Sequence, residues 1–412
     1  MMRSLFSAVS GLRSHQTRMD VIGNNIANVN TTAFKSSRVT FQEIFAQTLR
    51  GATAPTTGAT GRGGSNPLQV GLGVNLASID TIHTPGNLQP TGKSTDLAIE
   101  GNGFFVVKDG ERIVYTRAGN FDRDAWGTLV DSEGRKVLGW AAANGVLPPD
   151  RGAGNLTSIS IKVGEMMPAS ATRSVVWSKN LDAEAVAGFS RTIAVPVYDS
   201  LGRVQNLLVT FTKTANPNEW QWSCSWDQPP SQNVGSGTIQ FDTSGAVSNG
   251  GTATLNPFTP PGAATMTITF NFNAVTQVAG PTTVEPGEVD GSSTGTLESF
   301  AFDTNGVISG FYSNGRSRIL GQIALADFDN PGGLQKVGKN LFVESNNSGK
   351  AKIGAPDTGG RGRIAPSALE MSNVDLAEEF TQMIITQRGF QANSRIITVS
   401  DEMLQELVNL KR

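Results

Sequence analysis

The sequence predicts a multidomain, mainly β protein that carries a long α-helix at each end of the chain. Two observations lead to this fold class. Apolar residues recur at every seventh position near both termini, which is typical of helices that pair with other helices. Between the termini, short apolar runs alternate with turn residues, and the 412-residue chain contains 47 glycines, as many short strands require. We expect the two terminal helices to form a coiled-coil domain, with two nested β domains between them.

The first expected element is a helix over residues 2–30, with Ser4 as its N-cap. Its apolar row consists of Leu5, Leu12, Met19 and Ile26. A second row, three residues further on, consists of Ala8, His15, Ile22 and Val29. The residues that disfavour a helix here are Gly11, Gly23, Asn24, Asn25 and Asn28. Each glycine costs about 1 kcal/mol relative to alanine, so this helix needs neighbours to be stable.

Residues 31–50 lead into a second amphipathic segment, whose four apolar residues recur at helical spacing and so indicate a helix. These residues are Phe41, Ile44, Phe45 and Leu49. The next stretch, 51–66, consists mainly of Gly, Ala, Thr and Pro and has no large apolar residue, so we expect a flexible or loosely packed linker.

The signals from residue 68 onward are those of strands. Gly101-Asn102-Gly103 predicts a hairpin turn between strands at 97–99 and 104–107. Hairpin turns recur at 304–306 and 313–315, after Pro- and Gly-rich borders at 144–154 and 280–295. We therefore expect nested domains: an inner β domain of 76–145 plus 296–368, an outer inserted β domain of 146–295, and a connecting segment of 36–75. The terminal helical domain comprises 1–35 plus 369–412.

The last expected element is a helix that starts near Ser372, with Ser372 or Asn373 as its cap, and ends at Arg412. Its apolar row consists of Leu369, Leu376, Met383, Phe390, Ile397 and Leu404. A second, partly polar row consists of Phe380, Gln387, Ser394, Asp401 and Val408. Polar groups in such a row weaken a helix pair but fix its register among several helices.

Composition argues against several classes of protein. The net charge is −2 and no long basic run occurs, so nucleic-acid binding has no electrostatic support. Cys224 is the single cysteine and the chain has two histidines, so an internal disulfide, a zinc site and a hydrolase triad are not expected. The sequence has no apolar run long enough to span a membrane and no signal-peptide pattern. We expect neither enzymatic activity nor a metal or cofactor.

Three long motifs resemble the bacterial flagellar rod and hook family. Residues 23–35 read Gly-Asn-Asn-Ile-Ala-Asn-Val-Asn-Thr-Thr-Ala-Phe-Lys and are similar to the amino-terminal signature of that family. Residues 369–375, 387–393 and 407–410 resemble its carboxyl-terminal segment. Residues 96–105 and 115–121 are similar to its central β domain. The rod members are much shorter, so the insertion at about 145–295, with Val-Tyr-Asp-Ser-Leu-Gly at 197–202, favours a resemblance to the hook-forming members.

The resemblance implies a structural homopolymer: the curved, bendable tube that joins the flagellar motor to its filament. It also implies an extracellular location, export through the flagellar type III apparatus without a cleaved signal peptide, and no insertion into a membrane. The implied partners are rod proteins, the proteins of the hook–filament junction, the hook cap and the export apparatus. Two alternatives stay open, namely a distal rod protein and a secreted β-rich adhesin.

The mechanism that we expect is head-to-tail assembly through the terminal helices. Both ends should be largely disordered in the free monomer and become ordered on polymerisation, while the β domains slide over one another when the tube bends. The residues expected at the assembly interface are Leu5, Leu12, Met19, Ile22, Asn24, Asn25, Ile26, Asn28, Leu376, Phe380, Met383, Phe390, Ile397 and Leu404.

Overall fold

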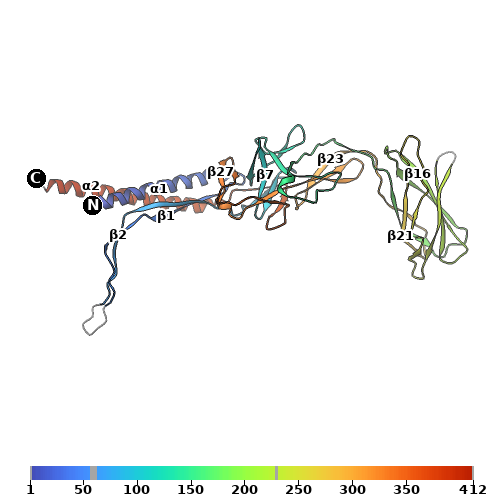
Figure 1. Ribbon diagram of the computed structural model, residues 1–412, viewed down its shortest axis with the longest axis horizontal. Helices are drawn as coiled ribbons and strands as arrows, with labels where there is room; N and C mark the ends of the chain where they lie inside the picture. The colour runs from blue at the N-terminus through green and yellow to red at the C-terminus, as the bar shows by residue number, and fades with distance from the viewer. Residues whose placement is uncertain (1, 56–62, 228–230, 411–412) are drawn as a thin grey trace. The chain divides into compact units, whose positions relative to one another are not determined.

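The computed structural model describes residues 2–55, 63–227 and 231–410, and these residues divide into two compact units (Figure 1). The first unit comprises Met1–Ile161, Ala301–Ile308 and Ile319–Arg412. The second comprises Lys162–Phe300 and Ser309–Arg318. The chain thus begins and ends in the first unit and passes through the second unit twice, at 162–300 and at 309–318.

The two long helices both belong to the first unit. Helix α1 spans Met2–Ala27 and helix α2 spans Leu376–Asn409. Two predicted caps are wrong. Ser4 lies inside α1, and α2 is capped by Asp375, whose side chain accepts hydrogen bonds from the backbone N–H groups of Ala377 and Glu378.

The ends of both helices also differ from the prediction. The helix has not begun at Ser372 and Asn373. The Asn373 side chain bonds the backbone of Ser36 and Ile82 instead of capping the helix. Helix α1 ends three residues before the predicted residue 30, where Asn24 and Asn28 form a closing turn. Lys411 and Arg412, expected to end the second helix, lie outside the described residues.

The predicted helical character of residues 31–50 is also wrong. Strand β1 (Ser37–Glu43) pairs antiparallel with β4 (Val74–Thr81), and β2 (Ala46–Arg50) pairs antiparallel with β3 (Leu68–Gly71). The physical reason is the alternation of Val39 and Phe41 with polar neighbours, which suits one face of a strand. Thr53 and Ser65 pair across the expected linker, whose residues 56–62 lie outside the description.

The remaining β-structure of the first unit is built around one sheet. Its main path there runs β25-β11-β7-β8-β28-β27, and its core contains Phe104, Tyr115, Trp140 and Phe342. The strands that lie wholly within this unit, apart from β1–β4, are β5 (Leu88–Pro90), β6 (Leu97–Glu100), β7 (Phe104–Asp109), β8 (Arg112–Thr116), β9 (Asp122–Arg123), β10 (Leu129–Val130), β11 (Lys136–Ala141), β12 (Thr157–Ser158), β26 (Leu325–Asp327), β27 (Gln335–Gly338), β28 (Leu341–Val343), β29 (Lys352–Gly354), β30 (Arg363–Pro366) and β31 (Ala368–Glu370).

The strands on either side of Gly101-Asn102-Gly103 exist, but they do not form the predicted hairpin. Strand β6 pairs with β30, whereas β7 pairs with β8. Gly101 and Gly103 have φ angles of 111° and 120°, so the chain makes a corner between two sheets there. The predicted turns at 304–306 and 313–315 do join successive strands, because β23 (Gly295–Phe302), β24 (Val307–Tyr312) and β25 (Ser317–Ile323) are neighbours in order.

The second unit contains two sheets that share an aromatic core. One sheet has the order β20-β21-β14-β22 and the other the order β15-β16-β17-β18-β19. The strands that lie wholly within this unit are β13 (Met166–Met167), β14 (Ser174–Asp182), β15 (Ser190–Tyr198), β16 (Val204–Lys213), β17 (Glu219–Trp226), β18 (Gln232–Phe241), β19 (Val247–Asn249), β20 (Thr252–Thr254), β21 (Thr269–Val278) and β22 (Glu285–Val289). Cys224 is buried among Trp222, Trp226 and Phe270, and burial raises the pKa of its thiol to about 12, so the group behaves as a packed side chain.

Candidate assembly interface

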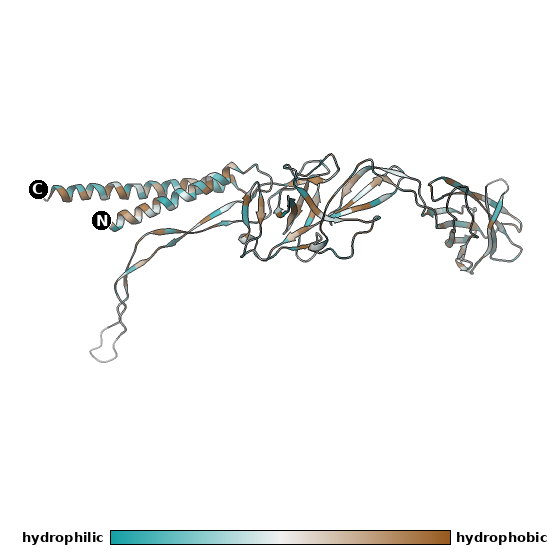
Figure 2. Cartoon of the chain, turned by 45° about the horizontal axis from the view of Figure 1, so that its top comes forward, coloured by the Kyte–Doolittle hydropathy of each residue, from teal (hydrophilic) through white to brown (hydrophobic). Residues whose placement is uncertain are grey.

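The terminal helices α1 and α2 lie side by side and run antiparallel (Figure 1). Apolar and polar segments alternate along both of them (Figure 2), as expected for helices with more than one contact face. The residues of α1 that pairing and packing bury are mostly small or polar, namely Ala8, Gly11, Ser14, Ile22 and Asn25. In α2 the buried residues are Thr386 and Ser400. Because the buried residues are mostly small, the backbones of the two helices can lie close together.

Two glycines allow this close approach. A Cβ atom on Gly389 would lie 2.7 Å from Cε1 of His15, and a Cβ atom on Gly11 would lie 2.8 Å from Nδ2 of Asn393. Each helix thus places a larger side chain over a glycine of the other. Gly23, by contrast, has no atom within 4 Å of such a Cβ, so it is not needed for packing in this way.

Polar contacts fix the register of the pair. The Asn25 side chain donates a hydrogen bond to Oε1 of Glu379 in α2 (2.8 Å) and exchanges hydrogen bonds with the backbone of Ser37 in β1 (2.9 and 3.0 Å). Arg18 donates to the side chain of Gln382. Burial raises the pKa of Glu379, whereas the hydrogen bond from Asn25 opposes that rise. Asn25 therefore ties α1, α2 and β1 together at one point.

The hairpin of β1 and β4 packs against α1. The ring of Phe41 makes an edge contact with His15, with 5.8 Å between ring centroids, and the Arg18 guanidinium also lies 5.8 Å from the Phe41 centroid. Ser10 accepts a hydrogen bond from the backbone N–H of Val74 (3.2 Å). One side of α1 is thus occupied by α2 and another by this hairpin.

The structure places the predicted interface residues at different depths. Ile22 and Asn25 are buried between the elements. The half-buried residues are Leu5, Leu12, Met19, Ile26, Asn28, Met383, Ile397 and Leu404. The residues that stay exposed are Asn24, Leu376, Phe380 and Phe390. The apolar row of α1 is therefore partly covered along its whole length, while that of α2 is exposed at Leu376 and again at Phe390.

Several exposed apolar residues of the helices lie outside the predicted rows. In α1 these are Met2, Phe6 and Val9. In α2 they include Ile384, Ile385, Ile396, Val399, Met403 and Leu407. They belong to neither of the two seven-residue rows predicted on each helix, although the same periodicity starting at Ile385 reveals a further row.

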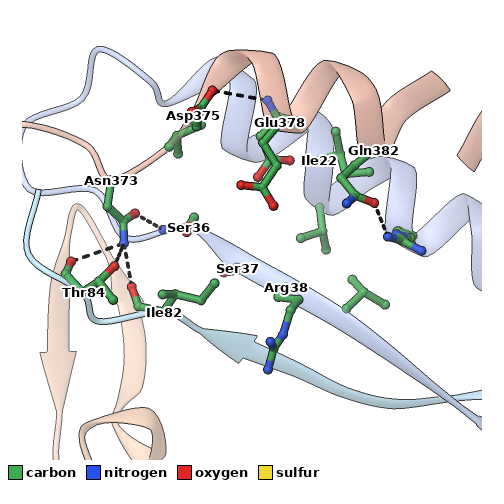
Figure 3. A pocket seen from close by; sticks show the side chains of 15 residues that line it. Ile22, Ser36, Ser37, Arg38, Ile82, Thr84, Asn373, Asp375, Glu378 and Gln382 are labelled. Atoms are coloured by element: carbon green, nitrogen blue, oxygen red, sulfur yellow. Dashed lines mark hydrogen bonds between the residues drawn. The ribbon is translucent and has the colours of Figure 1, made fainter. Parts of the chain in front are cut away.

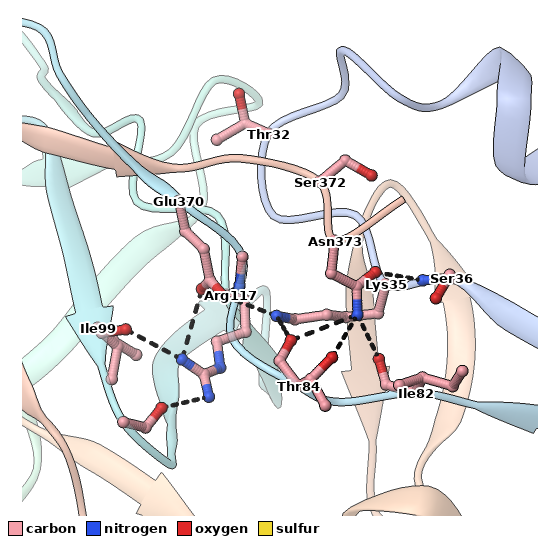
Figure 4. Close-up of polar contacts among 12 residues, drawn as sticks. Thr32, Lys35, Ser36, Ile82, Thr84, Ile99, Arg117, Glu370, Ser372 and Asn373 are labelled. Carbon is pink, nitrogen blue, oxygen red and sulfur yellow. Dashed lines mark hydrogen bonds and ion pairs between the residues drawn. The ribbon is translucent and has the colours of Figure 1, made fainter. Parts of the chain in front are cut away.

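A buried ion-pair cluster joins the two ends of the chain beneath the helices (Figure 4). The Nζ atom of Lys35 lies 2.6 Å from Oε1 of Glu370, and both side chains are fully buried. Lys35 also donates to the carbonyl of Thr84 (2.7 Å), and Glu370 accepts from the backbone N–H of Gly86 (2.9 Å). In the sequence, Lys35 and Glu370 appear only as parts of separate motifs, because no local pattern pairs residues so far apart.

Arg117 of the β domain completes this cluster. It lies 3.4 Å from Oε2 of Glu370 and donates to the carbonyls of Ile99 (3.3 Å) and Gly101 (2.7 Å). One carboxylate thus faces two buried cations, and desolvation lowers the pKa of both Lys35 and Arg117. Breaking such a cluster leaves an uncompensated buried charge, which is strongly destabilising.

Asn373 connects the segment before α2 to the β1–β4 hairpin. Its Oδ1 accepts from the backbone N–H of Ser36 (2.8 Å), and its Nδ2 donates to the carbonyl of Ile82 (2.9 Å) and to Oγ1 of Thr84 (3.0 Å). A pocket of about 350 Å³ opens beside it (Figure 3). Side chains of α1, α2 and the hairpin line this pocket, including Arg18, Arg38, Glu378 and Glu379.

His83 lies beside the cluster of cations. Its ring makes contacts with Phe104 and Phe342, with centroid distances of 5.7 and 5.5 Å. Burial, together with the positive charges of Lys35, Arg117 and Lys336, lowers the pKa of His83 to about 4. The imidazole is therefore neutral at pH 7.

Within residues 2–55, 63–227 and 231–410, no group of three or more His, Cys, Asp and Glu side chains is placed to hold a metal ion. In the same residues, neither helix is long and apolar enough to cross a membrane. This arrangement presents long helical faces next to a β domain with a buried core.

Four family models match the chain. They are described as "Flagella basal body rod protein" for residues 5–35, "Flagellar hook protein FlgE/F/G D1 domain" for 98–166, "Flagellar basal body protein FlaE D2 domain" for 167–292, and "Flagellar basal body rod FlgEFG protein C-terminal" for 365–410. The matches cover both helices and both β units.

Relatives of known name match over their full length. The chain is 43% identical to the flagellar hook protein FlgE of Borreliella burgdorferi and 40% identical to that of Treponema pallidum, and the matches cover all of each chain. It is 34% identical to the flagellar basal-body rod protein FlgG of Bacillus subtilis, again over all of both chains. A crystal structure of the flagellar hook protein FlgE2 of Helicobacter pylori has a similar fold, with a TM-score of 0.53 at 17% identity, over 69% of this chain and 100% of that one.

Proposed function

Because the chain belongs to the family of flagellar hook proteins, we propose that its terminal helices are the surface through which copies assemble head to tail into the tube of the hook. The chain is a structural protein of the bacterial flagellum and serves motility as part of the hook. It polymerises, associates with the flagellar basal body, and belongs to a structure outside the cell. We propose that residues 1–35 and 369–412 act together as the polymerisation domain.

The observation that carries the interface proposal is that α1 and α2 stay apolar on their outer faces after pairing. Phe6 is 68% exposed, Ile384 is 58% exposed and Val399 is 51% exposed. Exposed apolar faces of this extent mark a protein–protein contact in a soluble chain. A helical tube requires one patch to meet a different patch on the next copy, and two unlike helices supply such patches.

The junction at Glu370 supports a mechanical role for the same helices. Lys35, Glu370 and Arg117 connect both ends of the chain to the β domain through buried charges. Force on the paired helices therefore reaches the β domain through two chain segments at once. A tube that transmits torque needs such a connection.

The two alternatives fit less well. A rod protein is disfavoured because identity to the FlgG rod protein of Bacillus subtilis is 34%, against 43% and 40% for two hook proteins. A secreted adhesin would have no need of the long paired helices.

Membership of this family also suggests further partners. We propose contacts with rod proteins at one end of the polymer and with the hook cap and the hook–filament junction proteins at the other. We also propose export through the flagellar type III apparatus without a cleaved signal peptide, and no enzymatic activity. Co-purification of the tagged chain with assembled basal bodies tests the proposed contacts. Amino-terminal sequencing of the exported protein tests export without a cleaved signal peptide.

The test of the interface proposal is removal of α2. A chain ending at Val374 keeps Glu370 and Asn373, so the β domains should stay folded by circular dichroism and thermal unfolding. Electron microscopy of the purified chain should then show no tubes. The matched control ends at Leu410 and keeps the whole of α2, so it should form tubes. Ordinary hollow tubes from the chain ending at Val374 would disprove the proposal.

A further inference from the structure

Helix α2 carries an apolar face beside the one that contacts α1. Its residues recur at helical spacing and are Ile385, Ala392, Ile396, Val399, Met403 and Leu407, which we call the α2 side face. All six are exposed, and Ile385 and Val399 are more than half exposed. Pairing with α1 thus leaves a continuous apolar stripe over the carboxyl-terminal half of α2.

Helix α1 has a shorter exposed face that points away from α2. Met2, Phe6 and Val9 form it, and Arg13 and Asp20 continue the same row at helical spacing; we call these five residues the α1 outer face. Met2 and Phe6 are 63% and 68% exposed. Neither α2 nor the β1–β4 hairpin covers this row, since both pack on residues of other rows such as His15 and Ser10.

The charges along the two faces are complementary. Arg13 and Asp20 are seven positions apart on α1, and Arg395 and Glu402 are seven positions apart at the border of the α2 side face. All four side chains are exposed, and within the described part of the chain none of them makes a side-chain hydrogen bond or ion pair. In an antiparallel pair of helices, Arg13 would face Glu402 and Asp20 would face Arg395 at the same time.

Polymer symmetry requires that antiparallel direction. All copies in a head-to-tail tube point the same way, so α1 of one copy runs antiparallel to α2 of a neighbour, as it does within one copy. Within one copy His15 lies opposite Gly389, whereas the charge match sets Arg13 opposite Glu402. The contact between copies is therefore shifted along the axis by about three helical turns, or roughly 16 Å.

We propose that the α1 outer face of one copy binds the α2 side face of a second copy in this shifted antiparallel register. The proposal rests on assembly through the terminal helices and names the surfaces that meet. Phe6 and Val9 pack against the Met403–Leu407 end of the α2 side face, and the four charges set the register, as flanking charges do in coiled coils. The shift carries each copy beyond the end of its neighbour, so the chain of contacts continues along the tube.

The test exchanges charges without changing the net charge. One variant carries Arg13→Glu with Asp20→Arg, a second carries Arg395→Glu with Glu402→Arg, and a third carries all four changes. Each of the first two should raise the critical concentration for polymerisation about tenfold or more, because both pairs become repulsive. In the third variant the critical concentration should return close to the wild-type value, because each contact between copies then pairs opposite charges again.

The control exchanges Glu111 and Arg112, two exposed residues at the turn between β7 and β8, and should polymerise like the wild type. Wild-type assembly by either two-residue variant, or no recovery in the four-residue variant, would overturn the proposed register. Such results leave the truncation test unaffected, so the two proposals can fail separately.

A cross-linking measurement checks the contact directly. Val9→Cys combined with Leu407→Cys should give a ladder of covalently joined chains when polymer is oxidised, whereas Val9→Cys alone should give none. The natural thiol of Cys224 is buried and does not interfere. Absence of the ladder from polymer of the double variant would contradict the proposal.

Discussion

At the scale of single residues, Glu370 connects more of the molecule than its position on a short strand suggests. Its carboxylate faces Lys35 from the amino-terminal segment and Arg117 from the β domain, and its backbone carbonyl accepts from Ala33. All three charged side chains are almost completely removed from water. Their stability therefore depends on mutual compensation.

The first prediction concerns this cluster. Glu370→Gln removes the only negative charge in it, so the free energy of unfolding of the monomer should fall by about 3–5 kcal/mol, measured by chemical denaturation. Glu100→Gln is the matched control. Glu100 forms an exposed ion pair with Arg363, and its loss should have little effect. Equal effects of the two substitutions would show that the buried cluster is not a structural lock.

The second prediction concerns pH and His83. Its pKa is about 4 in the folded chain and about 6.5 when exposed, so the unfolded state binds a proton that the folded state does not. His83 therefore lowers stability progressively as pH falls from about 6.5 to about 4. His83→Gln removes this proton uptake.

The comparison should be made as unfolding free energy at pH 7 and pH 4.5 for both proteins. The wild type should lose more stability than His83→Gln over this interval. The difference isolates His83, because the carboxylates that titrate in the same interval are common to both chains. Parallel loss of stability in the two proteins would contradict the assigned pKa.

At the scale of elements, the helix pair depends on glycine more than on large apolar contacts. Gly389 lies against His15 and Gly11 lies against Asn393, with no room for a methyl group. His15 cannot move freely, because its other side packs on Phe41. The same glycines lower the intrinsic stability of the helices, so the pair depends on contact with its surroundings.

The third prediction compares two glycines of opposite character. Gly389→Ala should weaken the helix pair by roughly 1–3 kcal/mol through overpacking against His15, and so lower the thermal midpoint for dissociation of the polymer. Gly23→Ala has open space and should raise it through helix propensity, which is worth up to about 1 kcal/mol. Circular dichroism during heating measures both midpoints. A rise for both variants would show that the close approach at Gly389 is unimportant.

The fourth prediction concerns ordering of the helices. We expect α1 and α2 to be largely disordered in the free monomer and to order on polymerisation, because α1 contains Gly11, Gly23 and three asparagines. Far-ultraviolet circular dichroism should show more helix per chain in polymer than in monomer. The chain ending at Val374 supplies the baseline without α2. Equal helix content in monomer and polymer would defeat this expectation.

At the scale of the whole molecule, the chain combines two compact units with a segment that joins the helices to the β domain. Each unit has its own buried core, which suits a part that keeps its shape under load. When the tube bends, the movement must then occur between units that each keep their own shape. Small sliding movements of packed elements are one known way to do so.

The fifth prediction tests the segment at 51–66. Deleting residues 54–61 should leave tubes that form but differ in curvature or flexibility, because the rest of the hairpin of β2 and β3 remains to pair. Electron microscopy of curvature and persistence length measures this. Tubes of unchanged shape and bending would show that the segment has no role in either property.

Much of the architecture followed from local patterns. The terminal helices, the strand regions and the turns at 304–306 and 313–315 were all predictable, because periodicity and turn chemistry act over a few residues. The errors arose where local signals compete. Phe41, Ile44, Phe45 and Leu49 suit a helix by spacing, yet pairing with β4 and β3 makes the segment strands.

The sequence by itself determined that this chain ends in two helices suited to pairing, that strands lie between them, and which family it resembles. Only the tertiary structure decided which residues meet. Lys35 and Glu370 are 335 positions apart, and no local pattern pairs them. The helix faces left open to a second copy were equally undecided, because exposure depends on where α1, α2 and the β1–β4 hairpin pack. Burial and charge compensation are properties of the folded arrangement, whereas periodicity is a property of the chain.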